Sequence, residues 1–106
     1  MNIIKKSPAF IDWLNRIADI QAKARVRNRI RNAENSNFGD HHFLRDGVSE
    51  MRIDYGPGYR IYYAQEGAAV FLLLAGGDKR TQNRDIARAV SIWQAWKASK
   101  EQEEGK

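Results

Sequence analysis

Four polar side chains stand in two adjacent segments in the middle of the chain, and their types suit phosphate binding and proton transfer. Arg52 and Asp54 precede the run Gly56-Pro57-Gly58, and Arg60 and Tyr62 follow it. A guanidinium forks onto phosphate oxygens and keeps its charge, whereas a carboxylate or a phenol can exchange a proton. If the segments pair as strands, all four side chains lie within cross-strand reach on one face. The same arrangement also fits an ordinary solvated sheet face with an Arg–Asp ion pair.

Two strands within residues 48–63 must position these side chains. Both segments are rich in β-branched and aromatic residues, and the glycines and proline between them supply the dihedral angles of a tight turn. Side chains alternate faces along a strand, so Glu50, Arg52 and Asp54 share one side. An apolar set occupies the other side: Met51, Ile53, Tyr55, Tyr59, Ile61 and Tyr63. The sequence therefore predicts an antiparallel hairpin with one apolar and one polar face.

Length, composition and charge limit the classes of protein to consider. The 106 residues fit one domain, expected over residues 1–100, with a frayed tail over 101–106. The chain has no cysteine, which excludes disulfides and thiolate metal sites. It also lacks an apolar run of membrane-spanning length and a signal-peptide core, so we expect a soluble cytoplasmic protein. The net charge of +5 favours a polyanionic partner.

Two helices are predicted before the hairpin. Ser7-Pro8 is an N-cap followed by proline at the first helical position, and an apolar stripe follows at Phe10, Trp13, Leu14 and Ile17. A second stripe, Val26, Ile30 and Ala33, predicts another helix beyond a joint at Asp19-Ile20. The rest of that helix is basic, with Lys23, Arg25, Arg27, Arg29 and Arg31. This basic face fits either a solvated helix surface or contact with phosphates or an acidic partner helix.

The remaining segments complete an α+β fold. We expect a possible edge strand at Asn2–Lys5, a strand at His41–Arg45 and a turn at residues 65–67. The apolar run Ala68–Ala75 predicts an interior strand covered on both sides, which the run Gly76–Arg80 should end. A helix is predicted over Asp85–Lys100. The fold class is thus two N-terminal helices, an antiparallel meander of three or four strands and a C-terminal helix, with the helices on one face.

Two further residue pairs have a possible chemical role. Trp93 and Trp96 of the last helix are expected to be core or groove anchors, and a platform on which bases stack is the alternative. Adjacent histidines in a strand point to opposite faces, so His41 and His42 make a poor metal pair. We therefore expect no metal site and no cofactor.

Four stretches resemble the RelE/ParE superfamily of bacterial type II toxins, closest to its phage-borne and HigB-like addiction-module killer proteins. The stretches are Phe10–Leu14 with Ala22–Arg25, Asn37–Asp40, Gly47–Tyr63, and Leu72–Lys79 with Thr81-Gln82 and Asp85-Ile86. The resemblance implies a RelE-like toxin neutralised by a helix-turn-helix antitoxin, with which it binds operator DNA. RelE-type and HigB-type members cut messenger RNA on the ribosome, whereas ParE members poison DNA gyrase, and the fold does not choose between them.

The resemblance also implies an active surface. It assigns phosphate contacts to Arg60 and to Arg52 on the preceding strand, and adds Lys79 after the last strand. This sequence departs from the nucleases in having Asp54 in place of a second lysine and Asp85 in place of a tyrosine, so Tyr62 is considered as the phenol. Further RNA contacts are expected from Lys23, Arg27, Arg31 and Arg80.

Three functions stay open at this point. The first is a ribosome-dependent, metal-independent messenger RNA endoribonuclease, in which the cations stabilise the transition state and Asp54 or Tyr62 positions the hydroxyl. The second is a gyrase poison without nuclease activity. The third is a non-toxic co-repressor module of the same fold.

Overall fold

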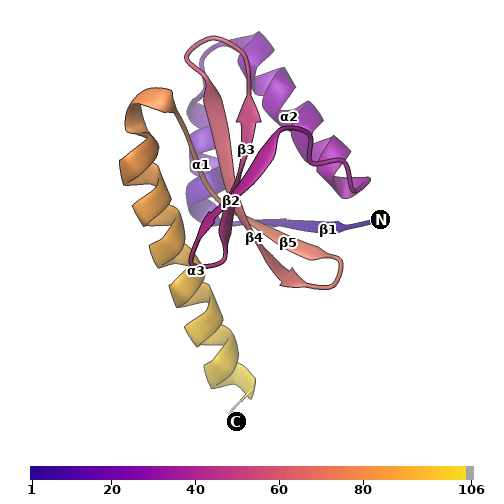
Figure 1. Cartoon of the computed structure of the whole chain (residues 1–106), viewed down its shortest axis with the longest axis vertical. Coiled ribbons are helices and arrows are strands. Elements are labelled where there is room, and N and C mark those ends of the chain that lie inside the picture. Colours follow the sequence, from indigo (N-terminus) through magenta and orange to yellow (C-terminus); the bar gives the residue numbers. More distant parts are fainter. Residues whose placement is uncertain (105–106) are drawn as a thin grey trace.

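The computed structural model describes residues 1–104 and confirms the predicted α+β architecture (Figure 1). The elements are β1 (Ile3–Lys6), α1 (Pro8–Arg16), α2 (Ile20–Glu34), β2 (His41–Arg45), β3 (Val48–Ile53), β4 (Tyr59–Gly67), β5 (Val70–Asp78), the 3-10 turn η1 (Lys79–Thr81) and α3 (Gln82–Glu104). The strands form one sheet in the order β1-β5-β4-β3-β2. β2 to β5 are the predicted antiparallel meander, and β1 adds an edge strand that runs parallel to β5.

Local side-chain caps divide the N-terminal helices as the sequence predicts. Ser7 Oγ accepts a hydrogen bond from the Phe10 N–H at 3.0 Å and starts α1. Asp19 Oδ1 accepts hydrogen bonds from the N–H groups of Gln21 at 2.9 Å and Ala22 at 3.2 Å, which starts α2. Because a capping residue has extended rather than helical backbone angles, Asp19 separates the two helices.

Helices cover both faces of the sheet, which corrects the expectation that they share one face (Figure 1). On one face, residues of α1 and α2 such as Phe10 and Val26 pack with Met51 and Ile61 of the hairpin. On the other face, residues of α3 such as Val90 and Trp93 pack with Tyr62, Leu72 and Leu74. The consecutive apolar residues of β5 project to both faces, so each face needs its own cover. Part of the predicted polar face of the hairpin is consequently buried under α3.

Three element boundaries differ from the predictions. β4 continues to Gly67, so the turn before β5 lies at Ala68 and Ala69 rather than at 65–67. β5 continues through Gly76 and Gly77, where a Cβ would collide with the Trp13 ring and the Asp85 carboxylate, respectively. These glycines permit close packing within a strand instead of ending it. α3 spans Gln82–Glu104, so the segment expected to fray is helical to residue 104, and residues 105 and 106 lie outside the described part.

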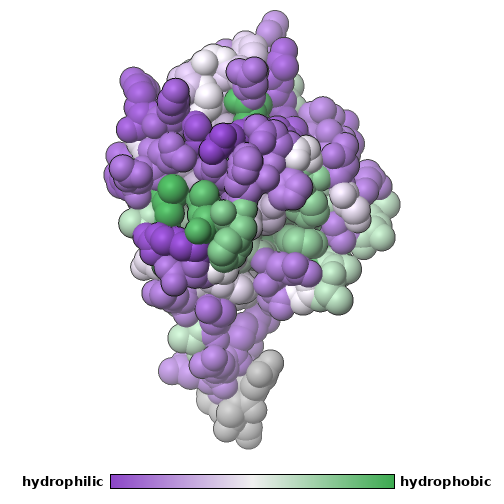
Figure 2. All heavy atoms as spheres, in the orientation of Figure 1, coloured by the Kyte–Doolittle hydropathy of each residue, from purple (hydrophilic) through white to green (hydrophobic). Residues whose placement is uncertain are grey.

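On the face shown in Figure 2, the middle is more hydrophobic than the end above it. Figure 2 shows hydrophobic surface gathered in a band across the middle of the molecule, at the level of β1 and β2 in Figure 1. The end that carries the β3–β4 turn and the start of α3 is mostly hydrophilic. Among residues 1–104, no helix combines the length and the apolar character that a membrane crossing requires.

Candidate functional site

Two rows of residues cross the sheet on the face that α3 covers. Strand register places Arg52 of β3 opposite Arg60 of β4, which pairs in turn with Gly77 of β5. The neighbouring row runs through His42 of β2, Glu50 of β3 and Tyr62 of β4. Residues directly opposite in antiparallel strands present their side chains on the same face, so these two rows form one polar surface.

A pocket of about 300 Å³ opens beside this surface, between the β3–β4 turn and η1. Its lining is Asp40, Arg52, Ile53, Asp54, Gly58, Tyr59, Arg60 and Lys79. The structure therefore brings together four of the five predicted catalytic residues, Arg52, Asp54, Arg60 and Lys79. The strand pairing explains the two arginines, and the end of β5 at Asp78 brings Lys79 to the same place.

The carboxylate that pairs with the arginines is Glu50 and not Asp54, the partner predicted from the sequence. Glu50 Oε1 accepts a hydrogen bond from Arg52 Nε at 2.8 Å, and Glu50 Oε2 lies 3.6 Å from Arg60 Nε. Glu50 is fully buried. Asp54 lies one residue beyond the end of β3, is exposed, and forms no ion pair within residues 1–104. The signal that was missed is the spacing of Glu50, two residues before Arg52 on the same face of a strand.

Glu50 and the backbone hold the two guanidiniums in fixed positions. Arg60 is only 8% exposed, and its Nη1 donates to the Gly58 carbonyl at 2.9 Å. The hydrogen bond and the charge of Glu50 raise the pKa of Arg52, which is exposed. Glu50 balances one of the two arginine charges, and exposed Lys79 adds another cation. The site thus offers charged donors suited to one phosphate group, while Asp40 and Asp54 on the rim offer acceptors for hydroxyl or base N–H groups.

Tyr62 does not line the pocket, which differs from the position that its predicted catalytic role requires. Its side chain is fully buried and packs with Leu72 and Leu74 beneath α3. Burial, followed by the charge of Glu50, raises the pKa of the Tyr62 phenol, so the hydroxyl stays protonated. That hydroxyl has no hydrogen-bond partner among the described residues.

Replacing Tyr62 with phenylalanine tests the predicted catalytic role. We expect Tyr62→Phe to keep its activity and to gain up to about 1 kcal/mol in free energy of unfolding, because an unpaired buried hydroxyl is removed. Tyr55→Phe is the control, since the Tyr55 hydroxyl donates to Asp19 at 3.0 Å and its loss should reduce stability. Thermal unfolding measures the stability, and the RNA cleavage proposed below measures the activity. A folded Tyr62→Phe protein that is a hundredfold slower would restore the phenol to the mechanism.

Asp85 stands where the resembling nucleases have a tyrosine, and here its carboxylate stabilises the start of α3. It is 2% exposed and accepts hydrogen bonds from Thr81 Oγ1 and, at 3.3 Å, from Arg84. Asp85 belongs to the first turn of α3, and its carboxylate lies against Gly77 of β5. An acidic group there interacts favourably with the positive end of the helix dipole.

The predicted RNA contacts fall on two separate parts of the molecule. Arg80 lies in η1 next to Lys79, and its guanidinium pairs with Asp78 at 3.2 Å. Burial alone would raise the pKa of Asp78, but hydrogen bonds from Arg80 lower it below its usual value. The other three, Lys23, Arg27 and Arg31, belong to α2, which packs on the opposite face of the sheet. The structure does not bring these three to the pocket.

One basic residue of α2 does reach the strands of the site. Arg29 donates to the carbonyls of Arg52 and, at 2.8 Å, Phe38. Burial lowers the pKa of Arg29. Arg29 therefore holds the backbone near the C-terminal end of β3. At least this basic residue of α2 stabilises the fold.

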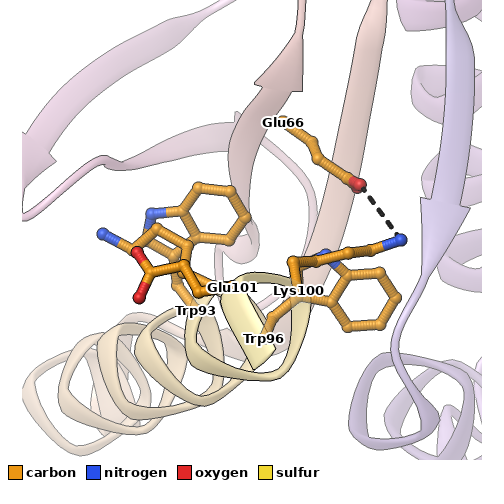
Figure 3. A pocket seen from close by; sticks show the side chains of 6 residues that line it. Glu66, Trp93, Trp96, Lys100 and Glu101 are labelled. Carbon is orange, nitrogen blue, oxygen red and sulfur yellow. Dashed lines mark ion pairs between the residues drawn. The ribbon is translucent and has the colours of Figure 1, made fainter. Parts of the chain in front are cut away.

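The two tryptophans of α3 form a second hollow of about 290 Å³ (Figure 3). Trp93 is 7% exposed and packs in the core, as expected of an anchor. Lys5 and Lys100 lie over the Trp96 ring at 5.8 and 5.6 Å from its centroid, and Lys100 also pairs with Glu66 at 3.9 Å. Ammonium groups thus occupy the ring face that a base would need for stacking.

The described part of the chain contains no cluster of metal-binding side chains. No three His, Asp or Glu side chains of residues 1–104 come together in a way that could hold a metal ion. His41 and His42 point to opposite faces of β2, as predicted from their adjacency.

Comparison with known proteins adds a relative. No model of a known protein family matches the chain. The chain is similar to a protein of Haemophilus influenzae (strain ATCC 51907 / DSM 11121 / KW20 / Rd) described as an uncharacterized protein. The two are 42% identical over 86 residues, which cover 81% of this chain and 87% of the relative.

Proposed function

Because the chain belongs to the same protein family as the uncharacterized Haemophilus influenzae protein, whose description names no activity, we propose a function from the site itself. The proposed function is a metal-independent endoribonuclease that cuts messenger RNA on the ribosome, as the toxin of a type II toxin–antitoxin pair. The observation that carries it is the single open pocket shared by Arg52, Arg60 and Lys79. The proposed antitoxin is a helix-turn-helix protein, through which the pair binds operator DNA. The resemblance to RelE and HigB-type toxins supports these partners.

The pocket suits a phosphodiester that is attacked by its own 2′-hydroxyl. In that reaction negative charge builds up on the phosphoryl oxygens of the transition state. Arg52 and Arg60 come from paired strand positions and can share those oxygens, with Arg60 held by Glu50 and the Gly58 carbonyl. Lys79 comes from η1 and lines the same pocket, next to Gly58. Preorganised cations of this kind lower the barrier without rearranging during the reaction.

A second function is favoured by a specific observation. Tyr62 is buried and Asp85 serves α3, so neither supplies the aromatic acid or base found in the best-known nucleases of the resemblance. A protein with only the cationic part of the site would bind without cutting, as expected of a gyrase poison. In that case the basic surface of α2 would be the binding surface.

Mapping transcript ends after brief induction in growing cells separates the two functions. The ribonuclease predicts new ends at codon boundaries that disappear when translation is blocked. Intact messages together with DNA damage would overturn it in favour of gyrase. Arg45→Ala is the control for any substitution of a pocket arginine. Arg45 is an exposed arginine of β2 that pairs with Asp46 at 2.7 Å and does not line the pocket. That variant should remain fully toxic.

A further inference from the structure

His42 stands next to the pocket, on the same sheet face as the arginines. In β2 it lies directly opposite Glu50 of β3, in the row beside Arg52 and Arg60. Its Nε2 lies 3.1 Å from Oδ1 of Asp40, which lines the pocket. The Arg52 N–H donates to the Asp40 carbonyl at 2.9 Å, so the backbone that carries this pair is joined to β3. The His42 side chain is 50% exposed, which leaves it accessible to RNA.

The other groups at the site are less suited to accept a proton. Asp54 on the rim is a carboxylate, and carboxylates are weak bases at neutral pH. Arginine and lysine hold their protons at neutral pH. Glu50 is buried between two guanidiniums, and Tyr62 is buried as a neutral phenol. Imidazole is the side chain whose ordinary ionisation falls near neutrality, which suits a general base. A carboxylate on one ring nitrogen leaves the lone pair of the other nitrogen available.

We propose, on the basis of the ribonuclease function above, that His42 is a catalytic residue that accepts the proton of the attacking 2′-hydroxyl, with Asp40 as its positioning residue. His42 Nε2–H donates to Asp40, and Nδ1 takes the proton as the O2′–P bond forms. The P–O5′ bond breaks, and the Lys79 ammonium gives a proton to O5′. The products are a 2′,3′-cyclic phosphate and a 5′-hydroxyl. Water then carries the proton from His42 back to Lys79, so no proton is gained or lost.

The charges around His42 come from its own segment and from the layers beside it. Asp40 precedes it, and β3, its strand neighbour, contributes Glu50 and Arg52. α3 contributes Asp85, whose charge acts on Tyr62 in the same row. Because the neutral imidazole is the active form, cleavage should rise with pH as His42 loses its proton.

The adjacent histidine provides a matched control. His41 points to the opposite face of β2, and its Nδ1 lies 2.7 Å from the Gly39 carbonyl. It lines a separate hollow with Phe38 and Tyr63. His41→Ala therefore removes the same side chain one residue away without touching the proposed mechanism.

The test follows single-turnover cleavage of a translated messenger RNA by the full chain across a pH series. We expect His42→Ala to lower kcat by about a hundredfold or more with KM within about threefold, and to lose the rise of rate with pH. Added imidazole should restore part of that rate, while His41→Ala should match the wild type. His42→Gln, checked for folding by thermal unfolding, provides a second variant. A folded His42 variant with the wild-type rate and pH profile would overturn the inference, whereas a wild-type protein that cuts no RNA would overturn the ribonuclease itself.

Discussion

Arg60→Lys is expected to slow RNA cleavage by about a hundredfold to a thousandfold while the protein stays folded. Lysine keeps the positive charge near Glu50, but its ammonium lacks the planar fork with which the guanidinium donates from Nη1 to the Gly58 carbonyl while presenting its other N–H groups to a phosphate. The loss should appear in kcat more than in KM, because the charge on phosphate is greatest in the transition state. Single-turnover rates on ribosome-bound message, together with growth inhibition in cells, measure it.

A control variant separates loss of the Arg60 guanidinium from the general effect of replacing an arginine with lysine near the pocket. Arg80→Lys changes an arginine that follows Lys79 directly but is exposed and paired with Asp78. We expect its cleavage rate to stay within about threefold of the wild type, since an exposed pair contributes little. If Arg60→Lys is folded and cleaves at the wild-type rate, Arg60 does not contact the phosphate.

Glu50→Gln is expected to have the largest effect on stability, a loss of about 3 kcal/mol in free energy of unfolding. Glu50 is fully buried and is the carboxylate shared by Arg52 and Arg60. Glutamine keeps the shape but leaves the nearly buried Arg60 guanidinium without a counter-charge, and breaking a buried pair in this way is costly. The melting temperature should fall by about 10–20 °C, as measured by circular dichroism or calorimetry. Cleavage should also slow, because both arginines lose their common support.

Asp12→Asn is the matched control for that charge change. Asp12 pairs with Arg16 at 3.2 Å on the exposed face of α1, one helical turn apart. Its loss should cost no more than about 0.5 kcal/mol. Equal melting temperatures for Glu50→Gln and Asp12→Asn would show that the ion pairs of Glu50 with Arg52 and Arg60 do not stabilise the fold.

The strand pairing of the site could be predicted from the sequence, because it depends on local chemistry. The glycines and proline between residues 56 and 58 specify a turn, and strand alternation then assigns Arg52 and Arg60 to one face. The observed register pairs these two residues directly. The cap at Ser7 could be predicted in the same way, since it depends on a side chain bonding to its own next turn, whereas at Asp19-Ile20 the sequence predicts a joint and the structure adds the Asp19 cap.

The partners within the site could not be predicted in this way. Glu50, Arg52 and Asp54 all point to one side of a strand, and alternation does not say where that strand ends. β3 ends at Ile53, so Asp54 reaches the rim while Glu50 lies beneath the guanidiniums. The sequence offers His42 only as a possible metal ligand, because its position opposite Glu50 depends on a pairing of β2 with β3 that the sequence does not specify.

The sequence by itself determined the elements, the hairpin and the face on which the arginines lie, since all of these follow from the chemistry of neighbouring residues. Only the tertiary structure decided which polar groups of that face meet solvent. Tyr62 is buried beneath α3 and Glu50 is buried beside it, while Arg52, Lys79 and the rim carboxylates stay open. Burial depends on which distant element packs on a face, and burial sets whether a side chain can contact a substrate or can only position another group.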